Sequence, residues 1–188
     1  DLTYTGKPQK LIRAIEGIEN EDKVEYSLDM GKSWSTEIPS GTNAGQYDVS
    51  IRLCRDENHK TKIIEPNPYT LFIKKAPQQI KFNNKELPEQ LTSDDIGKDF
   101  NFSVTSSSIE EPKITYTVEN DTEDNTTPIS EIAEIDQQGI LKILNDGYFI
   151  NIIATVEGDE NYETKTINHQ MSILMDDPNK LLVFEKQE

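Results

Sequence analysis

Alternation of apolar and polar side chains is the feature that most limits how this chain can fold. In the stretch QYDVSIRLC, Tyr47, Val49 and Ile51 occupy every second position, and polar residues stand between them. Successive side chains of a β-strand point to opposite faces of a sheet, so this pattern predicts a strand with one buried face. No segment longer than about ten residues shows the 3.6-residue period of a helix, so any helix is expected to be a single turn. The period of two recurs in residues 24–28, 69–75, 99–104, 113–118, 133–143, 148–156 and 166–173.

Turn residues separate these stretches and predict two hairpins. The first covers residues 23–38, with its turn at Gly31 and a returning arm that carries Trp34. The second covers residues 133–143, with a turn that ends at Gly139. Short strands at spacings of about 8–15 residues, with turns between them, are typical of antiparallel sandwiches and barrels. The sequence therefore predicts an all-β fold.

A short connection divides the chain into two modules. Pro77 closely follows an apolar stretch, and proline ends a strand because it has no backbone N–H. The charge changes at the same place, since the first 75 residues carry 11 basic and 12 acidic side chains and the remainder carry 8 and 23. We expect one domain over residues 1–76 and a second over residues 77–174. Residues 175–188 loosely echo the start of the second domain and are expected to be a tail or the start of a further module.

One phrase of seven residues occurs twice, about one domain length apart. In both modules it lies between the most apolar stretch and the last one, as DENHKTK and then as DENYETK. Asp and Asn accept turn conformations and bond their own backbone. We therefore expect a structural corner whose asparagine lies in the turn and whose ring packs against the end of the sandwich. The corner residues are Asp56, Asn58 and His59 in the first module and Asp159, Asn161 and Tyr162 in the second.

The net charge of −16 limits the partners that this chain can have. Such an acidic surface repels the phosphates of nucleic acids and anionic lipid headgroups, so neither is expected as a partner. No apolar run approaches the ~20 residues that a membrane-spanning helix needs, and membrane insertion is not expected. Cys54 is the only cysteine, which excludes an internal disulfide. We expect a monomeric globular chain.

The first module resembles a known family of repeats. The segments LTYTGKPQKLI, YSLDMGKSWSTEIPSGTNAGQYDVSIRL and DENHK are similar to the MBG-type Ig-like repeats of large bacterial surface proteins. The resemblance covers nearly all of residues 1–75 and implies an Ig-like β-sandwich. The positions that fall on the pattern are Tyr4, Gly6, Tyr26, Ser27, Gly31, Trp34, Pro39, Gly41, Asn43, Ala44, Gly45 and Tyr47.

The second module is similar to the bacterial Ig-like repeats of adhesins, through the segments ITYTVEN, AEIDQQGILKI and IIATVEGDENYETKTI. It differs from them by an acidic insertion, ENDTEDNTTPIS. Together the two resemblances imply two tandem Ig-like antiparallel β-sandwich domains in an exported bacterial protein, either secreted into the extracellular space or held at the cell surface. Such modules act as stalks, spacers or adhesive units beside the neighbouring domains of a longer chain. The families supply no catalytic residue.

Residues suited to catalysis are scarce in this chain. His59 and His169 are the only histidines, and each stands alone in the sequence. His169 is in phase with Ile167 and Met171, which favours a strand position over a catalytic one. No glycine-rich phosphate loop, HExxH, CxxC or GxSxG motif occurs. We predict that the protein is not an enzyme and needs no cofactor.

Calcium is the one metal that the sequence suggests. The acidic insertion concentrates oxygen ligands at Asp121, Glu123 and Asp124, and calcium prefers hard oxygen ligands. The segment lacks the glycine and the spaced glutamate of an EF-hand loop. The alternative is that these loop acids are only solvated, and the sequence leaves both interpretations open.

A second functional interpretation is a module that binds a glycan or a host protein, accessory to a secreted polysaccharide-active enzyme. A glycan site needs exposed aromatic rings that stack on sugars. Trp34 in the first hairpin and Tyr69 near a strand end are the candidate contacts. The alternative for Trp34 is a core position, because it would share its strand face with Ile38.

The two modules are predicted to fold independently, because each holds a complete set of alternating strands and its own corner. Residues 1–76 and residues 77–188, expressed separately, should each give a cooperative melt with a β-type circular dichroism spectrum. A half that stays unfolded alone would place the domain boundary elsewhere.

Overall fold

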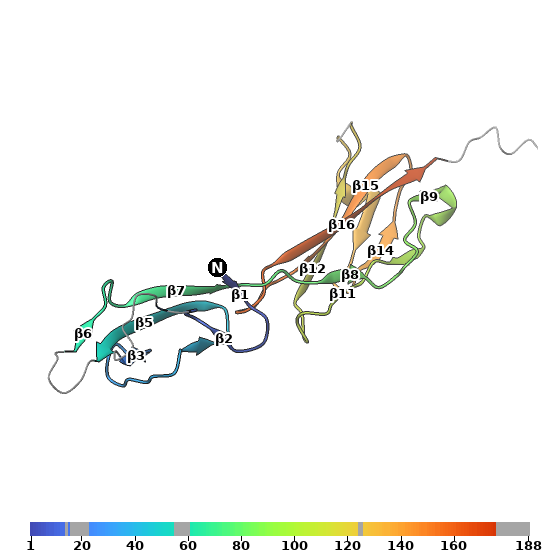
Figure 1. Cartoon of the computed structure of the whole chain (residues 1–188). Helices are drawn as coiled ribbons and strands as arrows, with labels where there is room; N and C mark the ends of the chain where they lie inside the picture. Colours follow the sequence, from blue (N-terminus) through green and yellow to red (C-terminus); the bar gives the residue numbers. More distant parts are fainter. Residues whose placement is uncertain (14, 16–22, 55–60, 124–125, 176–188) are drawn as a thin grey trace, which may run out of the picture. The chain divides into compact units, whose positions relative to one another are not determined.

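A computed structural model describes residues 1–13, 15, 23–54, 61–123 and 126–175. The chain forms two compact units, one of Asp1–Pro77 with Asp159–Glu163 and the other of Gln78–Gly158 with Thr164–Glu188. Strands dominate both units (Figure 1). Over the described part of the chain, the helices are α1 (Ile129–Ile132) and the 3-10 helix η1 (Ser93–Asp95), which confirms the expectation of single turns. In the same residues, no helix has the length and apolar character needed to cross a membrane.

The larger sheet of the first unit is built around β5. A second sheet of two strands completes the unit, and its core consists of buried residues from both sides, Leu11, Tyr26, Val49, Ile51 and Ile73. The strand predicted over QYDVSIRLC is thus confirmed, and Val49 and Ile51 are buried as its alternation requires. The larger sheet has the order β1 (Leu2–Thr3), β7 (Tyr69–Lys74), β5 (Gly45–Cys54), β3 (Lys23–Ser27), with β6 (Lys62–Ile63) also paired to β5. The smaller one pairs β2 (Gln9–Lys10) with β4 (Ser40–Gly41).

The second unit has a larger sheet built around β15. The inward residues Ile150, Ile152, Ala154 and Val156 of β15 are fully buried, and Leu141 and Ile143 of the facing sheet pack in the same core as Ile150 and Ile152. The larger sheet has the order β12 (Ile114–Asn120), β15 (Tyr148–Val156), β16 (Lys165–Leu174), β9 (Gln90–Thr92). The facing sheets are β10 (Asp99–Asn101), β14 (Ile140–Ile143), β13 (Ala133–Ile135), and the pair β11 (Val104–Ser106) with β8 (Ile80–Phe82).

The two units share one order of strands. β1-β7-β5-β3 in the first corresponds to β9-β16-β15-β12 in the second. In both, the strand at the edge runs parallel to its neighbour and the other pairs are antiparallel. The fold is all-β, with two tandem Ig-like sandwiches, as the sequence predicted. The sequence did not predict the parallel edge pairs, because alternation shows which face of a strand is buried and not which strand lies beside it.

The returning arm of the first predicted hairpin is not a strand. Only Ser35 pairs, through one bridge to Tyr26, and Leu28, which the pattern placed inward, is 52% exposed. Side chains accept hydrogen bonds from backbone N–H groups of this segment. Ser27 Oγ accepts from the N–H of Gly31 (2.8 Å), and Asp29 Oδ1 accepts from the N–H of Ser33 (2.9 Å). Such local hydrogen bonds compete with the backbone hydrogen bonds that would pair this segment with a neighbouring strand. The turn is therefore wide, and the expected strand after it does not form.

Residues 99–104 form two strands instead of the single strand expected from their pattern. β10 pairs with β14, whereas β11 pairs with β8 in another sheet. Between them Phe102 is fully buried, and its N–H donates to the carbonyl of Gly139 (2.8 Å). The chain therefore changes sheets at Phe102, as strands do at the corners of sandwiches.

The second predicted hairpin is confirmed, with β13 and β14 as its antiparallel arms. Asp136 Oδ1 closes the turn by accepting from the N–H groups of Gln138 (2.9 Å) and Ile140 (2.8 Å). Gly139 has φ of +78°, and a Cβ there would lie 2.9 Å from both Ser103 Cα and the Tyr116 ring. Both the backbone conformation and the space at this position therefore require glycine.

Gly139→Ala and Gly97→Ala should separate these two requirements. Gly97 has a similar φ of +79°, but nothing lies within 4 Å of a Cβ built on it. Gly97→Ala should lower the free energy of unfolding of the second unit by about 1 kcal/mol, the cost of the left-handed conformation. Gly139→Ala should cost about 2–4 kcal/mol, because overpacking adds to that cost. Denaturant unfolding measures both, and equal losses would contradict the steric clash at Gly139.

Candidate functional site

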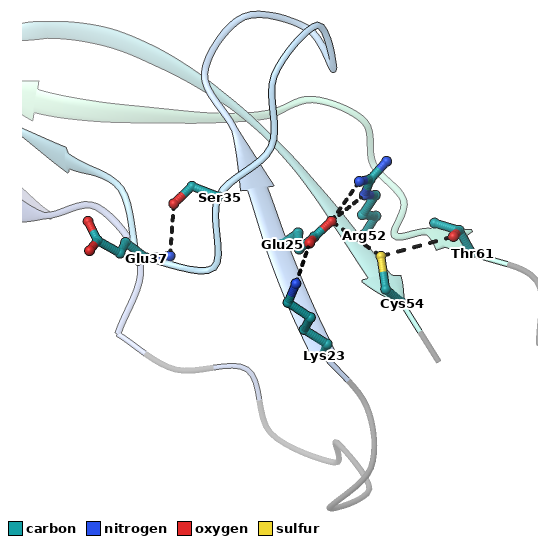
Figure 2. Close-up of polar contacts among 7 residues, drawn as sticks. All are labelled: Lys23, Glu25, Ser35, Glu37, Arg52, Cys54 and Thr61. Carbon is teal, nitrogen blue, oxygen red and sulfur yellow. Dashed lines mark hydrogen bonds and ion pairs between the residues drawn. The ribbon is translucent and has the colours of Figure 1, made fainter. Parts of the chain in front are cut away.

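A polar cluster surrounds Glu25 where β3 begins and β5 ends (Figure 2). The antiparallel register places Glu25 opposite Arg52 and Lys23 opposite Cys54, and side chains that face each other across strands are in contact range. The carboxylate accepts from Lys23 Nζ (2.9 Å), Arg52 Nε (2.8 Å) and Arg52 Nη2 (2.6 Å), and from Cys54 Sγ (3.3 Å). Thr61 Oγ1 in turn donates to Cys54 Sγ (4.0 Å).

These donors stabilise the charged form of Glu25. The hydrogen bond from Lys23, followed by those from Arg52 and Cys54, lowers the pKa of Glu25 to about 2. Glu25 is therefore ionised over the whole physiological range. Its role is to hold Arg52 in a fixed orientation, because a guanidinium bonded through two of its nitrogens cannot rotate freely.

Arg52 in turn covers the ring of Trp34. The guanidinium carbon lies 4.2 Å from the ring centroid, within the range of a cation–π contact. Trp34 Nε1 donates to the carbonyl of Gly31 (3.0 Å), and a Cβ on Gly31 would lie 3.2 Å from the ring. The ring is half-buried and is not a member of the core cluster of its unit. One of its faces is therefore occupied by Arg52.

A pocket of about 370 Å³ opens beside this ring. Hydroxyl groups make up much of its lining, and Asp29 orders two of them: its carboxylate accepts from Ser27 Oγ (2.7 Å) and Ser33 Oγ (2.6 Å). The bonds from Ser33, followed by that from Ser27, keep the pKa of Asp29 well below its usual range. The lining includes Ser27, Ser33, Trp34, Ser35, Glu37 and Ser40. The serines, Trp34 and Glu37, with the apolar Leu28, Ile38 and Pro39, give the pocket both hydrogen-bonding groups and apolar surface.

Tyr69, the other aromatic residue proposed to contact a glycan, packs mainly inward. Its ring is half-buried against the core of the first unit, and its hydroxyl donates to the carbonyl of Glu65 (2.7 Å). It lines an apolar pocket of about 320 Å³ with Leu11, Ile51 and Leu71. The structure does not bring Tyr69 into the pocket beside Trp34.

The structure describes two of the three residues proposed for calcium. Asp121 Oδ2 accepts from Gln170 Nε2 (2.8 Å), Glu123 is exposed, and Asp124 lies outside the described residues. Within the described ranges, no three His, Cys, Asp or Glu side chains are grouped to hold a metal ion. Calcium binding and the absence of a cofactor both stay predictions.

The second copy of the repeated phrase leads from β15 into β16, and its part Asp159–Glu163 belongs to the first unit. Asp159 Oδ1 accepts from the N–H groups of Asn161 and Tyr162 (both 2.8 Å), and Asn161 Oδ1 accepts from the N–H of Ala44 (2.8 Å). The Tyr162 ring packs edge-on against Tyr4, 5.3 Å between centroids. This ring was expected at the end of the second sandwich, and backbone pairing of Tyr162 with Ala76 explains the difference. Asp56, Asn58 and His59 of the first copy lie outside the described residues.

His169, the histidine that the structure describes, is a strand residue of β16. Its Nε2 is 2.7 Å from the carbonyl oxygen of Pro88, and its ring lies 5.6 Å from that of Phe102. Sequence reasoning missed the link from Glu25 through Arg52 to Trp34. The alternation of Lys23 with Glu25 and of Arg52 with Cys54 could have indicated it, but only once the register of the two strands was known.

Comparisons with known proteins do not place the chain in a family. No protein-family model and no curated protein matches it. Solved structures with a similar arrangement include Drosophila N-cadherin EC1-3, at 12% identity and a TM-score of 0.38, over 84% of this chain and 57% of that one. A second is a SusE-like surface-located polysaccharide-binding protein from the Bacteroides thetaiotaomicron heparin utilisation locus. Its sequence identity is 15% and its TM-score 0.35, and the match covers 86% of this chain and 30% of that one. A third consists of extracellular domains 3-5 of Drosophila OTK, with 15% identity and a TM-score of 0.34, over 93% of this chain and 62% of that one.

The chain thus spans less than two thirds of each of these proteins. TM-scores of 0.34 to 0.38 are too low for the likeness to support a function.

Glu25→Gln should destabilise the first unit in a pH-dependent way. The folded-state pKa of about 2 lies below the ordinary value of 4.5, so the stabilisation is complete above pH 4.5 and is lost as the pH falls toward 2. The difference in melting temperature between wild type and Glu25→Gln should be largest above pH 5 and should shrink toward pH 2. Glu37→Gln is the control, because Ser35 Oγ accepts from the backbone N–H of Glu37 and leaves its carboxylate uninvolved (Figure 2). A difference that does not vary with pH would contradict the charged cluster.

Proposed function

We propose that this chain is a non-catalytic segment of an exported, multidomain bacterial surface or secreted protein, in which Ig-like modules serve as a stalk or as adhesive units. Its partners in that role are the neighbouring domains of the longer chain, and it acts as a monomer. The bacterial Ig-like type of both modules is part of the proposal and rests on the sequence segments that resemble those repeats.

The parallel strand pair at the edge of each larger sheet carries the proposal. In the first unit, Leu2 and Thr3 of β1 lie beside Ile73 and Lys74 of β7, and the N–H of Tyr4 donates to the carbonyl of Lys74 (2.8 Å). In the second unit, β9 pairs with β16 over three residues. Each unit therefore joins a strand near its beginning directly to its final strand.

This arrangement suits a segment that bears tension. A pull on the two ends of a unit moves two parallel strands in opposite directions along their length. Their hydrogen bonds run across the strands, so all of them resist the sliding motion together. An antiparallel neighbour pulled from its two adjacent ends opens one bond at a time. Edge pairs of the first kind give a stalk the higher resistance.

The pocket beside Trp34 favours a second function, the binding of a glycan or a host protein. Its serine hydroxyls and its aromatic residue Trp34 are suited to a polar ligand. The two functions differ in one observable respect. A stalk alone shows no ligand on a glycan array, whereas a binding module shows a ligand whose retention Trp34→Ala abolishes.

Single-molecule pulling tests the mechanical role. In a Cys54→Ser background, the chain attached through its first and last residues should rupture at a higher force than the second unit attached through Asp146→Cys and Met175→Cys. Those two positions flank the antiparallel pair β15–β16 at the same end, so the second attachment unzips it. The rate of forced unfolding is the relevant quantity, and thermal stability is not. Equal rupture forces for the two attachments would contradict the stalk.

A further inference from the structure

Uncharged polar side chains predominate on the outer face of the larger sheet in the second unit. Inward residues of β12, β15 and β16 pack in the core, so every second residue of these strands points to the other side. Register places them in rows across the sheet: Thr115 beside Thr155, which lies beside Thr166, and Asn151 beside Gln170. We call this surface the outer face; its polar members include Thr115, Thr117, Asn151, Thr155, Asn168 and Gln170.

Charged side chains are few on the outer face. Glu119 and Lys165 are the only charged residues of these three strands, which the structure describes completely. Lys165 is paired with the buried Val156 and follows the inward alternation, whereas Glu119 lies on the outer face opposite Asn151. Asp121, which follows β12, adds a second carboxylate at the edge of this face, where it accepts from Gln170 Nε2 (2.8 Å). Elsewhere this part of the chain is strongly acidic, since residues 76–188 hold 23 acidic and 8 basic side chains. Depletion of charge from one face of a charged domain is a mark of an interaction surface.

Hydrogen bonds hold these side chains in order. Thr155 Oγ1 and Thr166 Oγ1 are 2.9 Å apart, and Asn168 Nδ2 donates to Asn151 Oδ1 (3.2 Å). Each amide has two donors and an acceptor with two lone pairs, so these bonds leave capacity for a ligand. Groups that are already ordered lose less conformational entropy when they bind.

Phe149 gives the outer face one exposed aromatic ring. It is 56% exposed on β15, and the small Ser172 lies opposite it on β16. Thr122 bonds both backbone groups of Phe149: its Oγ1 accepts from the N–H of Phe149 (2.9 Å) and donates to the carbonyl of Phe149 (3.4 Å). An apolar ring on a rigid strand, beside ordered amides and hydroxyls, combines a stacking surface with hydrogen-bonding groups.

We propose that the outer face binds a neutral polysaccharide. Sugar rings present apolar C–H faces that stack on an aromatic ring and hydroxyls that pair with threonine and amide groups. The two carboxylates of this surface, Glu119 and Asp121, and the acidic surroundings would repel an anionic polysaccharide, whereas a neutral one meets no such repulsion. The mechanical role does not depend on this proposal, and the site is distinct from the pocket beside Trp34.

Affinity electrophoresis of the 188-residue chain tests the proposal. Native gels contain one soluble polysaccharide each: the neutral polymers glucomannan, mixed-linkage β-glucan, arabinoxylan and galactomannan, and the acidic polymers heparin and alginate. At least one neutral polymer should retard the wild-type chain, and neither acidic polymer should. Phe149→Ala should weaken that retardation about tenfold in apparent Kd, the effect expected for one stacked ring. Asn168→Ala on the same face should weaken it as well.

Phe72→Ala is the matched control, because Phe72 is 57% exposed but lies on β7 of the first unit. It should leave the retardation unchanged, and so should Trp34→Ala. Circular dichroism melts confirm that each variant is folded. Retardation by no neutral polymer overturns the proposal, as does retardation by the acidic polymers alone. Loss of retardation in Trp34→Ala but not in Phe149→Ala assigns binding to the pocket beside Trp34 instead. A concentration-dependent dimer that Phe149→Ala abolishes reassigns the face to self-association.

Discussion

Pairing of the central antiparallel strands is the interaction on which the rest of this structure depends. In the second unit β15 pairs along its whole length with β16, and its inward side chains are fully buried between the sheets. A shift of one residue in this register would turn Ile150 and Ile152 to solvent and bring Phe149 and Asn151 into the core. Burial of the apolar set therefore decides the register, and the register decides which side chains form the outer face.

The same constraint builds the polar cluster of the first unit. β5 pairs with β3 so that Tyr26 and Ile51 are buried in one core, and this register places Glu25 opposite Arg52. Arg52 then has two partners, the carboxylate on one strand and the Trp34 ring on the turn. Hydrophobic burial thus fixes the strand register, and the register fixes the position of Arg52 over the Trp34 ring beside the surface pocket. The core is the cause here, and the charged contacts are its consequence.

Sequence patterns predicted the strands well where burial acts on one face only. β5, β12, β15 and the hairpin of β13 with β14 follow alternation of the kind that a half-buried strand requires. The pattern was wrong after Gly31, where side-chain bonds from Ser27 and Asp29 occupy the backbone of the turn. It was wrong again at Phe102, where the chain alternates correctly but changes sheets. Alternation reports burial, and it contains no information about the partner of a backbone N–H.

The sequence by itself determined the all-β class, the position of most strands and the acidic character of the second half, because side-chain period and charge are local properties. Only the tertiary structure decided that β1 and β9 run parallel to the last strands of their sheets, that Tyr162 packs on Tyr4, and that Arg52 lies over Trp34. Each of these contacts joins residues far apart in the chain. They exist because packing a whole core selects one register among many that satisfy the local pattern equally well.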